Sequence, residues 1–221
     1  MTSSGASSGA LDLSALAAGV DPATSITATD VGNGQTYPAT VVGYDRGHDI
    51  AVLQLRGATG LRTASIGDSS GVAVGDEIAA IGNAGGRGGT PSVAAGIVSA
   101  LGQTVTVSDD ITGSAEQLTG LIQVAADVAP GDSGGPLVNI AGQVIGIDTA
   151  GSAGSRWQPS GGDGLAIPIN DAIVISKQIR TGTASATVHI GATGILGVLS
   201  PGPDRAGNVE SPGRPGRRSS S

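Results

Sequence analysis

Short apolar stretches separated by glycine-rich turns organise the first part of the chain. Residues 25–29 alternate between apolar and polar positions, and residues 35–44 do so again after the turn Gly32-Asn33-Gly34. Alternation over this length is typical of a half-buried strand, and a turn containing Asn and Gly joins two such strands into a hairpin. Residues 49–55 are almost wholly apolar, so the pattern predicts a third strand there.

The same pattern continues through the middle of the chain and ends in a helix. The predicted strands are residues 75–81, 93–101, 103–108, 118–125, 136–139, 143–148 and 165–169. After the last strand, Ile173, Val174 and Ile179 fall on one side of a helix. Asn170 is the expected N-cap of this helix, and Gly182 marks its expected end.

Composition favours an all-β protein. The 221 residues include 39 glycines and 11 prolines, which helices tolerate poorly. Phenylalanine is absent and aromatic residues make up 1% of the chain, so the core must be built from Val, Ile, Leu and Ala. Because there is no cysteine, a disulfide framework and a thiolate metal site are both excluded. We expect neither a metal nor a cofactor.

Charge and hydropathy bear on the partners of the chain. The formal net charge of −7 argues against nucleic acid as a partner. No apolar run approaches the roughly 18 residues of a transmembrane helix, so we expect no transmembrane segment. Residues 1–23 are a low-complexity segment of Ser, Gly and Ala in which no secretory signal is evident.

A serine within a tight run of glycines carries the candidate chemistry. The string Gly-Asp-Ser-Gly-Gly-Pro occupies residues 131–136, and the backbone freedom of its glycines lets amide N–H groups converge on one point. Such a turn can form an oxyanion hole beside a serine nucleophile. A plain glycine-rich hairpin bend is the alternative, although the six-residue string is more specific. The string resembles the nucleophile motif of the trypsin-like, chymotrypsin-fold serine proteases.

Further strings, in the same order along the chain, resemble bacterial HtrA-like proteases. They lie at residues 43–53, 74–83, 96–101, 121–123, 142–147 and 165–168, so the resemblance covers roughly residues 24–180. It implies an all-β, chymotrypsin-like double β-barrel with an incomplete first barrel and one C-terminal helix. Residues 24–71 would be the remnant of the first barrel, residues 72–190 the second barrel with the helix, and residues 191–221 a disordered tail.

The resemblance also implies roles for individual residues. Ser133 would be the nucleophile, Asp49 the triad carboxylate, and the N–H groups of Gly131 and Ser133 the oxyanion hole. The substrate would be a polypeptide that adds as an extended strand beside Ile147, Asp148, Thr149, Ala150 and Gly151. Asp127 lies six residues before Ser133, where trypsin-like relatives place the base of the specificity pocket. The alternative for Asp127 is an exposed loop carboxylate.

The third member of the triad has no match. In the family, the histidine would fall at about Ala18, where its motif is absent. The chain contains two histidines, His48 and His189. His48 directly precedes Asp49, and successive residues of an extended chain point to opposite sides, so His48 should not bridge Asp49 to Ser133. We expect both histidines to be exposed and structural.

These patterns leave three interpretations. The first is a serine endopeptidase domain, truncated at its N-terminus and before a PDZ domain, whose acylation is impaired because the triad histidine is missing. The second is a catalytically silent peptide-binding module that keeps the substrate strand. The third is a purely structural glycine-rich β protein, which the ordered set of motifs disfavours.

An incomplete first barrel has a structural consequence. The apolar face that carries Ile50, Val52 and Leu55 would lack the strands that normally cover it. Exposed apolar faces and open strand edges favour association, so we expect a chain prone to aggregation.

Overall fold

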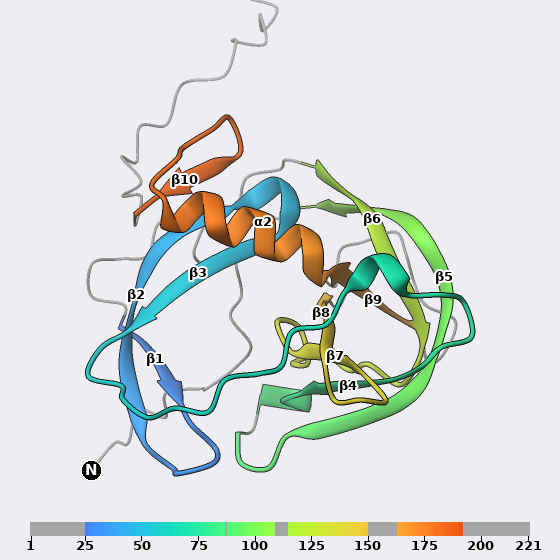
Figure 1. Cartoon of the computed structure of the whole chain (residues 1–221), viewed down its shortest axis with the longest axis horizontal. Coiled ribbons are helices and arrows are strands. Elements are labelled where there is room, and N and C mark those ends of the chain that lie inside the picture. Colours follow the sequence, from blue (N-terminus) through green and yellow to red (C-terminus); the bar gives the residue numbers. More distant parts are fainter. Residues whose placement is uncertain (1–24, 87, 109–114, 150–162, 192–221) are drawn as a thin grey trace, which may run out of the picture.

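The computed structural model describes residues 25–86, 88–108, 115–149 and 163–191. These residues form two sheets and one α-helix (Figure 1). The first sheet contains β1 (Ile26–Thr29), β2 (Thr36–Asp45), β3 (Ile50–Leu55) and β10 (Val188–Ile190). The β1–β2 hairpin was predicted from alternation and β3 from its nearly continuous apolar run, whereas β10 was not predicted.

The long strand β2 holds the first sheet together. Ala39 of β2 pairs with β1 on one edge and with β3 on the other, and Asp45 pairs with β10 and β3 in the same way. Strands β1 and β10 therefore share one edge of β2, and β3 occupies the opposite edge. The end of the described chain is thus attached to its beginning through β10.

Six strands close into an antiparallel barrel. They are β4 (Glu77–Gly82), β5 (Ser92–Ser108), β6 (Ala115–Ala125), β7 (Pro136–Asn139), β8 (Val144–Thr149) and β9 (Asp163–Pro168), in the order β4-β5-β6-β9-β8-β7. The two strands predicted at 93–101 and 103–108 are one strand, β5, because irregularities in its pairing with β6 replace the expected turn. Gly102, with φ of 68°, provides the left-handed residue within it.

Helix α2 (Ile169–Arg180) follows the barrel directly. Pro168 is its N-cap, so the prediction of Asn170 as the cap is wrong. The Asn170 side chain instead donates to Asp68 Oδ1 at 2.7 Å, and its backbone N–H donates to Ser69 Oγ at 3.1 Å. The helix ends as predicted, with Thr181 as C-cap followed by Gly182 at φ of 71°.

The helix packs across both sheets (Figure 1). A cluster of buried apolar side chains joins them: Ile50, Val105, Leu118, Leu121, Val144, Leu165, Ile167, Ile169, Ala172, Ile175, Ile179 and Val188. Ile50 is only 4% exposed and Val52 packs against the same cluster. The prediction that this face of the first sheet stays uncovered is therefore wrong for Ile50 and Val52, because they pack with side chains of α2 and with Val188 of β10; Leu55 is half-buried. Burying a side chain such as Ile50 stabilises the fold by about 1.5–3 kcal/mol.

A second apolar cluster fills the barrel, and its members include Ile78, Val98, Val124, Leu137 and Ala166. The core is thus aliphatic, as the composition requires. The described fold is mostly β, with one α-helix, a closed six-stranded barrel and a partial first sheet. The predicted fold class is confirmed.

Candidate active site

The loop of residues 126–135, between β6 and β7, holds Ser133 half-buried. We call residues 130–135 the serine loop. It is fastened to β8, because the Gly134 N–H donates to the Asp148 carbonyl at 2.7 Å and the Asp148 N–H donates to the Gly135 carbonyl at 2.8 Å. The Gly85 N–H also donates to the Pro130 carbonyl at 2.8 Å, so the loop is held on two sides.

Two glycines of the motif are required by their surroundings. Gly131 has φ of 104°, and a Cβ added to it would lie 2.5 Å from the Asn83 carbonyl oxygen. A Cβ on Gly135 would collide with the Ile81 carbonyl oxygen. Both contacts are with backbone, which cannot move aside cheaply. The loop therefore packs against the end of β4 too closely for any side chain at these positions.

Asp132 anchors the loop from inside. Its side chain is buried and accepts hydrogen bonds from Ser92 Oγ at 2.6 Å and from the Ala129 N–H at 2.9 Å. The backbone of Asp132 adds two turn bonds, from its N–H to the Ala129 carbonyl and from the Gly135 N–H to its own carbonyl. A carboxylate with several donors is well compensated for burial, so Asp132 fixes the position of the next residue, Ser133.

Asp49 lies at the end of a turn rather than within a strand. It follows the short 3-10 helix η1 (Arg46–His48) and has a left-handed backbone with φ of 55° and ψ of 39°. It is the one non-glycine residue of the described chain with positive φ. A left-handed backbone costs a residue with a Cβ roughly 1–2 kcal/mol, and strain of this kind is concentrated at functional sites.

Thr149 joins Asp49 to the barrel. Its Oγ1 donates to Asp49 Oδ2 at 3.2 Å, and Thr149 is itself buried. The neighbouring residue Asp148 makes the two backbone bonds to the serine loop. Consecutive residues of β8 therefore hold the loop that carries Ser133 and the carboxylate of Asp49. No pattern in the sequence indicated that Thr149 contacts Asp49.

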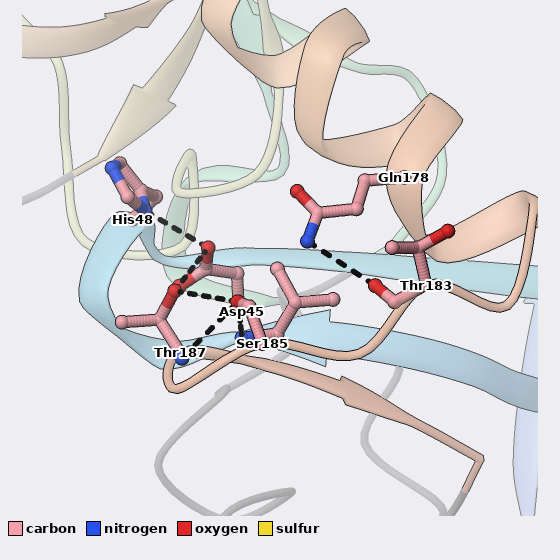
Figure 2. A network of polar contacts seen from close by, with 7 residues as sticks. Asp45, His48, Gln178, Thr183, Ser185 and Thr187 are labelled. Carbon is pink, nitrogen blue, oxygen red and sulfur yellow. Dashed lines mark hydrogen bonds and ion pairs between the residues drawn. The ribbon is translucent and has the colours of Figure 1, made fainter.

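His48 makes its ring contact with a different aspartate. Its Nδ1 lies 2.9 Å from Asp45 Oδ2 (Figure 2), and its side chain is 54% exposed. The same carboxylate oxygen accepts from Thr187 Oγ1 at 3.2 Å. Because His48 belongs to η1, the argument from an extended chain does not apply to it. Its exposure agrees with the prediction, and its partner is Asp45.

His189 lies in β10 at the edge of the first sheet. It pairs with Tyr44 across the strands and stacks on the Tyr44 ring with centroids 5.0 Å apart. The Arg46 guanidinium lies 5.5 Å from the same ring centroid. His189 is half-buried, so the prediction that it is exposed is wrong, because β10 pairs with β2 and brings it onto Tyr44.

The residues predicted to bind substrate have different environments. Asp127 is exposed just after β6, and Ile147 is a half-buried residue packed against the larger apolar cluster. Asp148 is only 1% exposed. A substrate strand cannot use the backbone N–H and carbonyl of Asp148 unless it displaces the serine loop. Ala150 and Gly151 lie outside the described residues.

Asp148 also has an unusual acidity. Burial, and secondarily the nearby charge of Asp132, raises the pKa of the Asp148 carboxyl to about 8. The sequence could have signalled this, since Asp148 continues the apolar run of residues 144–147. A carboxyl in such a run is buried whichever way the strand faces when both faces are covered.

Among the described residues, no three His, Asp or Glu side chains gather in a way that could hold a metal ion. None of the described helices combines the length and apolar character needed to cross a membrane.

Comparison with known proteins places this site in context. A family model described as a trypsin-like peptidase domain matches residues 13–147. The serine protease PepD of Mycobacterium tuberculosis is 41% identical over 168 residues, covering 73% of this chain and 35% of the relative. The periplasmic serine endoprotease DegP of Escherichia coli is 38% identical over 181 residues, covering 80% and 34%. The chain thus spans about a third of the length of these relatives.

Solved structures give the same result. The HtrA-type protease AlgW with a decapeptide superimposes with a TM-score of 0.60 at 34% sequence identity. The match covers 73% of this chain and 46% of the AlgW chain. This chain and AlgW are therefore similar both in sequence and in the arrangement of their strands.

Proposed function

From the premise that this chain belongs to the family of trypsin-like peptidase domains, with HtrA-like proteases as relatives, we propose that it is a serine endopeptidase domain for extended polypeptides whose own turnover is impaired. The single observation that carries the proposal is the arrangement around β8. Asp148 seats the loop that presents Ser133, and Thr149 holds Asp49. Ser133 is the proposed nucleophile and Asp49 the proposed carboxylate of the triad.

The oxyanion hole is proposed at the N–H groups of Gly131 and Ser133. Gly131 has φ of 104°, and the turn that contains Gly131 and Ser133 is held by hydrogen bonds of the Asp132, Gly134 and Gly135 backbone. Donors held by a rigid loop stabilise developing negative charge without reorganising. The close contact of Gly131 with the Asn83 carbonyl supplies that rigidity.

A polypeptide substrate is proposed to run alongside the end of β8. An extended peptide can add to a strand edge through its main chain, and the related protease AlgW is described with a decapeptide. The backbone of Asp148 already bonds Gly134 and Gly135, so within the predicted segment of residues 147–151 this residue is not free to pair with a substrate; Ala150 and Gly151 lie outside the described residues. Asp127, which is exposed, is proposed as a weak influence on the choice of substrate side chain.

The family's triad histidine has no match in this sequence, so we propose that acyl transfer at Ser133 is impaired. His48 engages Asp45, and His189 stacks on Tyr44 in β10. A serine without a base remains a weak nucleophile at neutral pH. These contacts favour a second candidate function, a catalytically silent module that binds extended peptides.

Labelling of Ser133 separates the two candidates. The whole chain and its Ser133→Ala variant are treated with a fluorophosphonate probe, and hydrolysis of unfolded casein is followed in parallel. Labelling and hydrolysis that disappear in the variant would establish a peptidase with a working base and would contradict the proposed impairment. No labelling in either protein, together with saturable binding of a fluorescent casein peptide by anisotropy, would establish the binding module. The absence of both would overturn the proposed function.

A further inference from the structure

A second buried carboxyl lies beside the serine loop. The Asp148 side chain is 1% exposed, and neither of its oxygens has a hydrogen-bond partner among the described residues. Asp132, whose charge acts on it, accepts two hydrogen bonds by contrast. Buried polar groups are almost always satisfied, and an exception in a folded domain calls for a specific explanation.

The backbone of Asp148 holds the serine loop, and ionisation of its side chain would disturb that contact. Its N–H and carbonyl bond Gly135 and Gly134, the two residues that follow Ser133. A negative charge on an unpartnered buried carboxyl is strongly disfavoured. Any ionisation of Asp148 therefore acts on the strand segment that seats the serine loop.

We infer that Asp148 is a positioning residue whose carboxyl must keep its proton for β8 to hold the serine loop. When the proton is lost, the free energy of the chain falls if the β8 segment around Asp148 opens and lets the carboxylate reach water. This breaks the bonds to Gly134 and Gly135 and frees Ser133 from its fixed position. The importance of this step for chemistry rests on the proposed function, but the step itself does not.

The charged group that acts on Asp148 opposes its ionisation. It is Asp132, in the serine loop. Asp49 is bonded to the side chain of the adjacent Thr149, which points to the opposite face of β8 from that of Asp148. The strands that pair with Asp148 contribute uncharged residues, Pro136 beside Ile147 on β7 and Ala166 on β9. No cation among these groups would stabilise a negative Asp148.

The direction of the pH dependence follows from proton binding. The pKa of Asp148 is about 8 with the loop seated, against the ordinary 3.8 of an exposed aspartate. Between these values the seated state binds one more proton than the open state. Opening therefore becomes about tenfold more favourable with each pH unit. It levels off above about pH 8, where both states have lost the proton.

Amide hydrogen exchange of the whole chain tests the inference. The rates of the Gly134 and Asp148 amides are measured by NMR between pH 5 and 8, in the wild type and in Asp148→Asn. Base-catalysed exchange from a locally opened state itself rises about tenfold per pH unit. We expect these two amides to approach a hundredfold rise per pH unit in the wild type and about tenfold in Asp148→Asn. The Asp30 amide, in the β1–β2 turn, should show about tenfold in both proteins.

A direct titration keeps the inference testable if the variant folds poorly. The carboxyl carbon of Asp148, followed by NMR in the wild type, should titrate far above the range of an exposed aspartate. Titration near pH 4, or equal slopes for Gly134 in the two proteins, would overturn the inference. Both readouts are independent of catalysis, so a silent chain with the steep slope would refute the peptidase and leave the role of Asp148 intact. A chain that labels at Ser133 without the steep slope would do the reverse.

Discussion

Thr149 Oγ1 lies 3.2 Å from Asp49 Oδ2, and this hydrogen bond joins the barrel to the first sheet at the candidate active site. A bond to an ionised carboxylate is stronger than a neutral one. Thr149 is buried, whereas Asp49 is half-buried. The bond therefore contributes to stability and fixes the direction in which the Asp49 carboxylate points.

Replacing Thr149 by valine should weaken the fold. The variant keeps the shape of the side chain and loses the donor, so the free energy of unfolding should fall by about 1–2 kcal/mol. Urea denaturation followed by circular dichroism measures the change. Thr149→Ser, which retains a hydroxyl, is the control and should lie closer to the wild type. Equal stability of the valine variant and the wild type would show that the Asp49 carboxylate is held by other contacts.

The left-handed backbone of Asp49 gives a second prediction. Asp49→Gly and Asp49→Ala both remove the carboxylate, so the difference between them isolates the backbone term. Glycine adopts φ of 55° freely and alanine does not. We expect Asp49→Gly to be more stable than Asp49→Ala by about 1 kcal/mol. An alanine variant as stable as the glycine variant would mean that the turn after η1 rearranges when the side chain is lost.

The network around Asp45 predicts unequal effects for its members (Figure 2). His48 is 54% exposed, so His48→Ala should cost at most about 1 kcal/mol. Asp45 is 2% exposed and accepts from both His48 and Thr187, so Asp45→Ala should cost about 2–3 kcal/mol. Thermal denaturation of the two single variants and the double variant measures their coupling. A larger effect for His48→Ala than for Asp45→Ala would contradict this order.

Asp148 predicts the pH dependence of global stability. Its folded pKa lies above its unfolded pKa, so the stability associated with its proton is complete below about pH 4 and is lost as the pH rises through about 8. Asp148→Asn has no such proton. As the pH rises across this window, the free energy of unfolding of the wild type should therefore fall relative to that of the variant by up to about 1.4 kcal/mol per pH unit. Denaturant titrations at pH 5, 6, 7 and 8 test this, and a constant difference between the two proteins would refute it.

Local chemistry made the serine loop predictable from the sequence. Gly131 and Gly135 stand where the backbone approaches the Asn83 and Ile81 carbonyls, and glycine is the residue that such contacts require. The ladder of short strands was predictable for a similar reason, since alternation along each strand reflects its own two faces. Turns and strands that depend only on neighbouring residues can therefore be predicted without knowing the rest of the fold.

Other features depend on residues far apart in the sequence. Asn170 has the character of an N-cap, yet Asp68 and Ser69 recruit its side chain. Strand β10 pairs with β2 although the sequence between them contains the whole barrel. That pairing brings His189 onto Tyr44 and adds Val188 to the apolar cluster that contains Ile50. Local pattern cannot indicate which distant partner a polar or apolar side chain will meet.

The last prediction concerns the missing base. In serine hydrolases, loss of the triad histidine lowers turnover by about 10⁶. The rate enhancement that remains comes from the oxyanion hole and from substrate binding. We therefore expect the chain to hydrolyse casein no faster than its Ser133→Ala variant.

The role of Asp49 offers a sharper form of the same test. A triad aspartate acts by orienting the histidine and stabilising its charged form. Without that histidine, Asp49→Asn should leave the residual hydrolysis unchanged. When the His-bearing segment of a relative is joined upstream of the chain, hydrolysis should appear, and Asp49→Asn should then reduce turnover by about 10⁴. If Asp49→Asn instead lowers Ser133-dependent hydrolysis in the chain alone, a base is already present, and His48 is the first candidate because it neighbours Asp49 in the turn.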